Sequence, residues 1–464
     1  MWFQLLSALT AALHGFVNRL RQGIIRAFLP RNRCRIDAAI ALHYLAGMHE
    51  GPEMSDLPKI FDLTPLNPAF NENPHALLDR LREQAPVYRD EVAGAFVLTR
   101  HADVRGVLSD TTLWRSPERA EEAAVLQKAI QNQVIEGLDI PEDEGRRGIL
   151  LMDDPDHARI RTPFAKALYK RVAKSRPLVQ QVVDEILAKL DDRARFDAMA
   201  DFALIVPIDV IARILGVDNT RLKEFREWSE GVILTLNPFR TPEQTEKLVK
   251  SFNALSAYMR DLMAKRRAQP EDDLVTDMVQ LKADGADLTD GEISINLQGL
   301  LIGGNLTTTD LIGNAIWLFL MHQEELAKLK ADPSLINSAV EEVLRYESPV
   351  DLTGRIASRD MEVGGCPMRQ TQAMYLELRG ANRDPAAFPD PHRFDISRKD
   401  APHVAFGGGT HLCIGAPLAR LEAQVALLSF FNRFPNLRLA DPSAAPKWRT
   451  LPFFRGLERL DVCG

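Results

Sequence analysis

Cysteine is scarce in this chain, with four in 464 residues: Cys34, Cys366, Cys413 and Cys463. They form no CxxC pair, so their spacing indicates neither a zinc site nor a disulfide framework. A reducing, cytoplasmic compartment fits this usage. Positive charge is not in excess either, because 57 Lys and Arg against 64 Asp and Glu give a formal net charge of −7. A nucleic-acid-binding protein would show a concentrated basic surface, so we expect no nucleic-acid partner.

The chain also lacks linkers, internal repeats and low-complexity tracts between about Met54 and its C-terminus. A length of 464 residues would usually suggest two or three domains of roughly 150 residues each. Without a linker, we instead expect a single large domain over residues 54–464, preceded by an N-terminal extension over residues 1–53.

The N-terminal extension contains no run long enough to span a bilayer. The apolar stretch Met1–Val17 is interrupted by Gln4 and His14 and falls short of the roughly 20 residues required. Its positive charges follow the apolar run, unlike those of a secretory signal. Apolar residues recur at helical spacing, which predicts a basic amphipathic helix able to contact a membrane surface: Trp2, Leu5, Leu9, Leu13, Phe16, Leu20 and Ile24. Alternatively, the natural start is Met54.

The most informative stretch present is FGGGTHLCIG, Phe406–Gly415. An amphipathic run, Ala416–Phe434, follows Cys413 and predicts that this cysteine lies where a helix begins. A helix N-terminus lowers the pKa of a thiol, and the glycines let the backbone approach a flat ligand closely. A thiolate held in this way is a strong electron donor to haem iron. The alternative is a buried structural cysteine in a glycine-rich loop.

This decapeptide resembles the haem-binding signature of the cytochromes P450, F-x-x-G-x-H-x-C-x-G, through Phe406, Gly409, His411, Cys413 and Gly415. The resemblance implies a mainly α domain with minor β-sheets, the cytochrome P450 fold. It implies haem b as the cofactor, with Phe406 in its binding loop and Cys413 as the axial iron ligand. The activity implied is that of a haem-thiolate monooxygenase, which inserts one oxygen atom of O2 into an organic substrate.

Further residues match positions that bind the haem propionates in this family. His157 and Arg161 are four apart in the helical stretch Met152–Arg171 and therefore share one helix face. Two such donors suit a carboxylate, although two solvated surface residues are the alternative. The resemblance implies that Arg355, in an extended segment, binds a propionate too, and that His411 completes the set.

A long apolar stretch from residue 290 to about 329 has no proline and predicts a buried helix. Within it, GGNLTTTD resembles the oxygen-binding motif of the family. The resemblance implies that Gly304 helps to leave room for O2 and that Thr307, followed by Thr308, hydrogen-bonds the oxygen and helps to deliver protons. Alternatively, Thr307 only bonds the carbonyl four residues earlier, as mid-helix threonines often do.

Leu306 stands where the family motif has an acid that relays protons, which leucine cannot do. Protons could come through water held by Asn305 or Thr308, or through Asp310, although a regular helix points Asp310 elsewhere. The departure keeps two alternatives open: a haem-thiolate peroxygenase or isomerase that does not rely on O2 activation, and a non-catalytic haem- or ligand-binding protein.

Other segments match the family in order. Glu342 and Arg345 are three apart on one predicted helix and resemble its E-x-x-R pair, and the resemblance implies that Arg393 completes a buried structural triad with them. The pattern predicts a helix over 74–84, a strand over 95–99 and a helix over 100–110. An irregular loop over 111–148 falls where the family covers its substrate pocket, and segment 364–378 lacks the usual hairpin turn.

We expect electrons from a ferredoxin- or flavodoxin-type donor with its reductase, since the sequence shows no FMN- or FAD-binding extension. Such donors are acidic, so a basic stretch could steer them, unless it is an ordinary charged helix face: Lys166, Lys170, Arg171 and Lys174. The candidate pocket residues are apolar and predict a small apolar organic substrate: Leu234, Leu236, Leu306, Val350 and Leu352. We expect a monomer.

Overall fold

The computed structural model describes residues 57–127, 135–140, 148–191, 193–237 and 240–464. The amphipathic helix predicted near the N-terminus lies outside these ranges, as does part of the predicted loop 111–148. Within them, no helix combines the length and the apolar character needed to cross a membrane.

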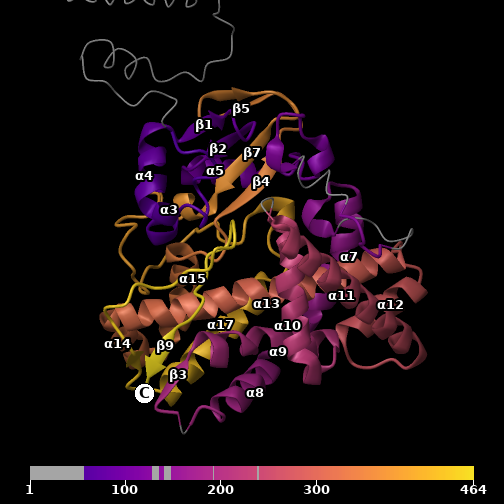
Figure 1. Ribbon diagram of the computed structural model, residues 1–464, viewed down its shortest axis with the longest axis vertical. Coiled ribbons are helices and arrows are strands. Elements are labelled where there is room, and N and C mark those ends of the chain that lie inside the picture. Colours follow the sequence, from indigo (N-terminus) through magenta and orange to yellow (C-terminus); the bar gives the residue numbers. More distant parts are fainter. Residues whose placement is uncertain (1–56, 128–134, 141–147, 192, 238–239) are drawn as a thin grey trace, which may run out of the picture.

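Helices make up most of the described chain (Figure 1). They are α3 (Pro68–Glu72), α4 (Pro74–Gln84), α5 (His101–Ser109), α7 (Asp156–Val172), α8 (Arg176–Leu187), α9 (Ile205–Leu215), α10 (Leu222–Val232), α11 (Pro242–Ala268), α12 (Leu274–Ala283), α13 (Asp290–Met321), α14 (Gln323–Ala331), α15 (Ile336–Tyr346), α16 (Leu378–Ala381) and α17 (Ala416–Arg433). The mainly α fold with minor β-sheets is therefore confirmed.

Strands form three small sheets. The four-stranded sheet has the order β1 (Val87–Asp90), β2 (Ala95–Leu98), β7 (Ala373–Glu377) and β4 (Leu352–Ile356), with β2 and β7 parallel and the other pairs antiparallel. The second sheet has the order β3 (Arg195–Asp197), β9 (Asp461–Cys463) and β8 (Arg438–Leu439). The third sheet consists of β5 (Met361–Val363) and β6 (Cys366–Met368). Figure 1 shows α4 and α5 beside the first sheet and the long helices on the other side of the molecule.

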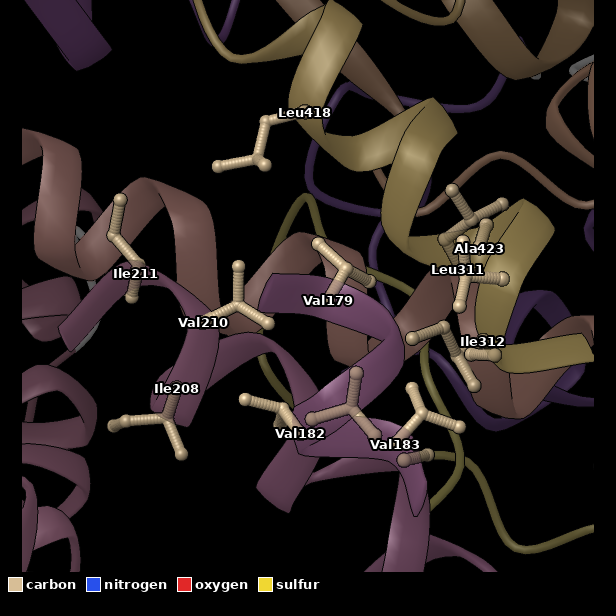
Figure 2. Packing of buried hydrophobic residues seen from close by; sticks show 14 of the residues in the cluster. Val179, Val182, Val183, Ile208, Val210, Ile211, Leu311, Ile312, Leu418 and Ala423 are labelled. Carbon is tan, nitrogen blue, oxygen red and sulfur yellow. The ribbon is translucent and has the colours of Figure 1, made fainter. Parts of the chain in front are cut away.

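The largest apolar core lies among those long helices. Valines of α8 and Val210 of α9 lie beside Leu311 and Ile312 of α13 and beside α17, and Ile208 and Ile211 of α9 belong to the same core (Figure 2). Close packing of this kind makes the helices a rigid support. It holds α13 against α17, so the threonine motif and the helix that follows the cysteine loop are fixed relative to each other.

The predicted buried helix from 290 to about 329 is two helices. α13 begins with a capping box, in which Thr289 and Glu292 each bond the other's backbone N–H. It ends at Met321, because His322 leaves the helical conformation with φ −117° and ψ 72° and α14 starts after it. The apolar pattern runs through this break, so periodicity alone did not predict it.

The segment without the usual hairpin turn still makes a hairpin. β5 and β6 pair antiparallel, with Val363 opposite Cys366. Gly364 and Gly365 between them have φ angles of 58° and 82°, as a two-residue type I′ turn requires. The glycine pair therefore takes the place of the family's turn.

Candidate active site

Glycine shapes the cysteine loop. Gly407 and Gly409 have φ angles of 70° and 64°, a region in which side chains are strained. A Cβ atom at Gly409 would lie 2.3 Å from the carbonyl oxygen of Leu108 in α5, so only glycine fits there. The sequence predicted a close approach of these glycines to a flat ligand. At Gly409 the close approach is to α5, which presses the loop against that helix.

Cys413 lies three residues before α17 begins, as predicted. Its side chain is exposed. Nevertheless, burial by surrounding protein atoms raises the pKa of the thiol, and the backbone N–H groups of Gly415 and Ala416 oppose this only in part. The exposure and the raised pKa are compatible, because protein atoms surround the thiol while a ligand can still reach it. The N–H groups at the start of α17 lower the pKa of this thiol, as predicted, but burial raises it more, so the net shift is upward.

Imidazole and guanidinium groups converge beside this loop: Arg115, His157, Arg161, Arg355 and His411. The rings of His157 and His411 stack with their centroids 4.1 Å apart. Arg161 of α7 donates to the carbonyl oxygen of Leu412. The structure thus brings together the four residues that the sequence assigned to the propionates, although they come from three separate segments.

This cationic cluster has too few negative partners. Burial and then repulsion by Arg115 lower the pKa of Arg355 to about 9, and burial and the surrounding cations lower the pKa of His411 to about 2. His157 faces Asp154 through Nδ1 at 3.2 Å, but its Nε2 is buried without a partner. Buried donors without partners are costly, and carboxylates suit them. The two propionates of haem b therefore fit this cluster.

Arg115 is the member that sequence reasoning missed. Its Nη1 donates to Oγ1 of Thr353 over 2.6 Å, and burial, opposed by Asp153, lowers the pKa of Arg115 to about 10. A β-bridge between Trp114 and Ile356 holds this part of the chain against β4. The residue lies in the segment expected to be an irregular loop, where no local pattern distinguishes it from the other arginines.

On α13, Oγ1 of Thr307 donates to the carbonyl oxygen of Gly303 over 3.0 Å, so the back-bonding alternative is present in the structure. A Cβ atom at Gly303 would meet nothing within 4 Å, whereas one at Gly304 would lie 3.2 Å from Ile211 of α9. The open space beside the helix is therefore at Gly303, and Gly304 permits close packing of α9. Thr308 is buried.

Leu306, which stands where the family motif has an acid, is buried in the structure, and so is Asn305. Asp310 is completely buried and accepts a hydrogen bond from Arg449 of the C-terminal segment. Its side chain therefore points toward that segment, as expected for a regular helix.

The Glu342–Arg345 pair is buried, with two hydrogen bonds of 2.7 Å and no exposed side-chain area. The prediction that Arg393 completes a triad with this pair is wrong. The Arg393 side chain is 63% exposed and only its carbonyl meets Arg345, whereas Nε of Arg398 lies 3.3 Å from Glu342. Both arginines follow α15 in irregular chain, so spacing alone does not tell them apart.

The apolar candidates lie on two elements besides α13. Leu234 and Leu236 belong to a 3-10 turn, Ile233–Leu236, and Leu234 is buried. Val350 forms a β-bridge with Phe454 of the C-terminal segment. Leu352 and Phe453 pack against the same apolar core cluster.

The basic stretch, which runs along α7 and ends just after it at Lys174, is only partly available to a partner. Lys166, Lys170 and Lys174 are exposed. Arg171 instead donates to Asp277 over 2.6 Å and to Asp272, which ties α7 to α12.

Comparison with known proteins shows the family of this chain. The family described as "Cytochrome P450" matches residues 109–446. "Cytochrome P450 107B1" of Saccharopolyspora erythraea is 36% identical over 408 residues, which cover 86% of this chain and 97% of that protein. The 6-deoxyerythronolide B hydroxylase of the same organism is 34% identical, with 82% and 94% covered. A solved structure of P450BioI with an acyl carrier protein ligated to hexadec-9Z-enoic acid has a TM-score of 0.76 at 33% identity, covering 86% of this chain and all of that one.

Proposed function

Because the chain belongs to the cytochrome P450 family, we propose a role in haem-thiolate oxygenation for each residue of its site. The chain is an oxidoreductase, a monooxygenase that binds haem b through a cysteine thiolate. When bound, haem b supplies the activation of O2 and the insertion of one oxygen atom into the substrate. The protein's part is to hold the haem, exclude water and manage protons.

Cys413 would be the axial ligand, because its thiol is reachable and its loop is fixed against α5. The cluster beside it would hold the propionates: Arg115, His157, Arg161, Arg355 and His411. Phe406 would support the ligand loop, since the Arg420 guanidinium lies 4.6 Å from its ring centroid and Glu341 binds Arg420 in turn. The single observation that carries the assignment is the cationic cluster, whose buried donors need anionic partners.

On α13, Thr307 would hold a proton on its hydroxyl for the reaction. Gly303 would leave open space there, Gly304 would let α9 pack closely against α13, and Thr308 would support the same turn. The apolar side chains nearby favour an apolar substrate. Relatives with solved structures carry myristic acid, testosterone or a carrier-ligated fatty acid, so fatty acyl and steroid compounds are the first to test.

The test is optical. Wild-type protein with haem should show the thiolate-type Soret band when reduced with CO, and Cys413→Ser should lose it. A matched control is Cys463→Ser, which removes the second cysteine that is free in the described part of the chain and should keep the band. A thiolate band retained by Cys413→Ser would refute the axial assignment. Titrating the ferric protein with fatty acids, steroids and terpenoids would then identify the substrate class by a saturable Soret shift.

Electrons would come from a ferredoxin- or flavodoxin-type donor with its reductase, docking on the exposed lysines of α7. The relative bound to an acyl carrier protein makes a carrier-bound substrate a further candidate. A single domain over 54–464, a monomeric state, a cytoplasmic location and membrane contact through residues 1–53 stay predictions.

One specific observation favours a second candidate function. Leu306 occupies the acid position and is buried, so O2-dependent proton delivery lacks its usual group, and a peroxygenase or isomerase would not need it. Efficient turnover with hydrogen peroxide and none with O2 plus a reductant would favour this candidate over the monooxygenase.

A further inference from the structure

Arg420 of α17 lies against the loop that carries Cys413. Its guanidinium carbon is 4.6 Å from the centroid of the Phe406 ring, within the range in which a cation is attracted to an aromatic face. The carbonyl oxygen of Phe406 in turn accepts a hydrogen bond from the backbone N–H of Cys413 over 3.0 Å. The cation, the ring and the backbone of the cysteine are therefore in direct sequence of contact.

A carboxylate from another helix fixes the Arg420 guanidinium. Nε and Nη2 of Arg420 donate to the two carboxyl oxygens of Glu341 in α15 over 2.7 and 2.9 Å. A bidentate pair fixes the plane of the guanidinium as well as its position. The side chains of Arg420 and Glu341 are only 35% and 31% exposed, so solvent screens their charges less than it would at the open surface.

His403 connects this ion pair back to the cysteine loop. Its Nε2 lies 3.0 Å from Oε2 of Glu341, and its Nδ1 accepts the backbone N–H of Ala405 over 3.2 Å. Burial raises the pKa of Glu341, but hydrogen bonds from His403 and Arg420 lower it to about 2, so Glu341 is a carboxylate. The contacts thus form a closed ring that runs from Phe406 through Arg420, Glu341 and His403 to the loop again.

The charge of Arg420 acts on the thiol of Cys413. Burial raises the pKa of this thiol, whereas Arg161 and Arg420 each lower it, so both cations favour the thiolate. They differ in their anchors. Arg161 donates to the carbonyl oxygen of Leu412 and belongs to the cationic cluster, while Arg420 carries its own countercharge in Glu341.

We propose that Arg420 raises the reduction potential of the haem iron through the thiolate of Cys413, and that Glu341 limits this effect. The inference rests on the proposed function, in which Cys413 is the axial ligand. One electron from the donor protein reduces ferric to ferrous iron and makes the site one unit more negative. A nearby cation therefore stabilises the reduced form and a nearby carboxylate the oxidised form. Groups around a metal ligand adjust a potential in this way.

The competing interpretation is that Arg420 only supports the loop by holding Phe406. Support depends on the bidentate hydrogen bonds, whereas an electrostatic effect depends on charge. Lysine at position 420 keeps the charge but cannot form the bidentate pair, and glutamine keeps neither. Loss of support would shift the potential in the same direction whether Arg420 or Glu341 is changed. Loss of charge would shift it in opposite directions.

The experiment measures the midpoint potential of the haem-loaded proteins by anaerobic dye titration. The reduced CO complex of each variant first reports whether the thiolate-type Soret band is present. In Arg420→Gln we expect the ratio of ferrous to ferric protein at a fixed potential to fall between about threefold and tenfold, or roughly 28–59 mV for one electron. Glu341→Gln, which keeps an acceptor for Arg420, should raise this ratio. Arg420→Lys should stay close to wild type.

A matched control is the pair of Arg221 and Glu224 at the start of α10. Nε and Nη2 of Arg221 donate to the two carboxyl oxygens of Glu224 over 2.9 and 2.7 Å, with the two side chains 36% and 48% exposed. The Arg221 guanidinium also lies over an aromatic ring, 5.3 Å from the centroid of Trp228. Arg221→Gln and Glu224→Gln therefore make the same chemical changes away from the cysteine loop and should leave the potential unchanged.

An unchanged potential in Arg420→Gln, or an equal fall in Arg420→Gln and Arg420→Lys, would overturn the proposal. A shift of Arg420→Gln and Glu341→Gln in the same direction would do so too. If Arg420→Gln binds no haem, Glu341→Gln decides, because a potential at or below that of wild type refutes the offsetting role. If Cys413→Ser keeps the thiolate band, the axial assignment fails and the proposal fails with it. A lost band with unmoved potentials defeats this proposal alone.

Discussion

The imidazole rings of His157 and His411 stack at a centroid distance of 4.1 Å with their planes 29° apart. This contact joins α7 to the cysteine loop. The pKa values of both residues are lowered, in each case chiefly by burial, so the rings meet as neutral groups. The positive charge that would face the haem propionates therefore comes from the arginines of the cluster, and the histidines contribute N–H donors and shape.

Replacing Arg355 with methionine should have opposite effects on the haem-free and the haem-bound protein. Arg355→Met removes a buried cation without a carboxylate partner, so we expect the haem-free chain to gain about 1–4 kcal/mol of unfolding free energy. Haem affinity should drop roughly tenfold or more, because a charge-assisted hydrogen bond contributes about 1.5–3 kcal/mol. Urea unfolding and transfer of haem to an acceptor protein measure the two effects.

The unfolding free energy gained by the haem-free Arg355→Met chain should depend on pH. The pKa of Arg355 falls from 12.5 to about 9 on folding, so the gain should be full below about pH 9 and shrink as the pH rises toward 12.5. Arg359→Met, at an arginine that is 52% exposed, is the control and should change stability by no more than about 0.5 kcal/mol. A haem-free Arg355→Met chain less stable than wild type would contradict the prediction.

Arg398, not Arg393, should stabilise the buried Glu342–Arg345 pair. Arg398→Ala removes a cation 3.3 Å from the fully buried Glu342, which keeps its bonds to Arg345. We expect a loss of about 1–3 kcal/mol in denaturant unfolding, the range for weakening a buried charged group. Arg393→Ala is the matched control at an exposed position and should stay within about 0.5 kcal/mol. The reverse order would restore the sequence-based assignment.

The sequence predicted those parts of the fold that rest on local pattern. The helix over 74–84 and the start of α13 at residue 290 agree with the structure, because caps and periodicity act within a few residues. The strand over 95–99 and the helix over 100–110 agree to within one residue at each end. The break at His322 was missed, since apolar residues continue on both sides of it.

The site was predicted where a residue's type and spacing carry the chemistry, as for Cys413 and the His157–Arg161 pair. Residues that reach the site from distant parts of the sequence were not predicted. Arg115 enters the cluster through a β-bridge to Ile356, and Arg398 reaches Glu342 across irregular chain. The raised pKa of Cys413 depends on burial by the whole fold, which no decapeptide shows.

Glu422 should lower the stability of the folded protein at neutral and alkaline pH but not in acid. The side chain is buried in α17, neither carboxyl oxygen has a partner, and burial raises its pKa well above 4.5. The folded state therefore binds a proton that the unfolded state releases, so this group's contribution to stability falls as the pH rises above about 4.5. Glu422→Gln should remove that loss and stabilise the protein at pH 8 but not at pH 4. A mutant less stable than wild type at pH 8 would mean that the carboxyl group has a partner in solution.

Charge on α7 should control the rate of electron delivery rather than the haem site itself. Lys166 and Lys170 are exposed on the helix whose Arg161 contacts the cysteine loop, so an acidic donor docked there would be near that loop. Reversing both charges in a Lys166→Glu, Lys170→Glu double variant should slow reduction by an acidic ferredoxin roughly tenfold at low salt. The difference should shrink at high salt, where exposed charges are screened. A Lys223→Glu, Lys250→Glu double variant, at exposed lysines of α10 and α11, makes the same change in net charge and is the control. Stopped-flow reduction under CO measures the rate, and dithionite reduction should be equal in all three proteins because it needs no docking. An equal slowing by the control variant would place the effect in net charge rather than in α7.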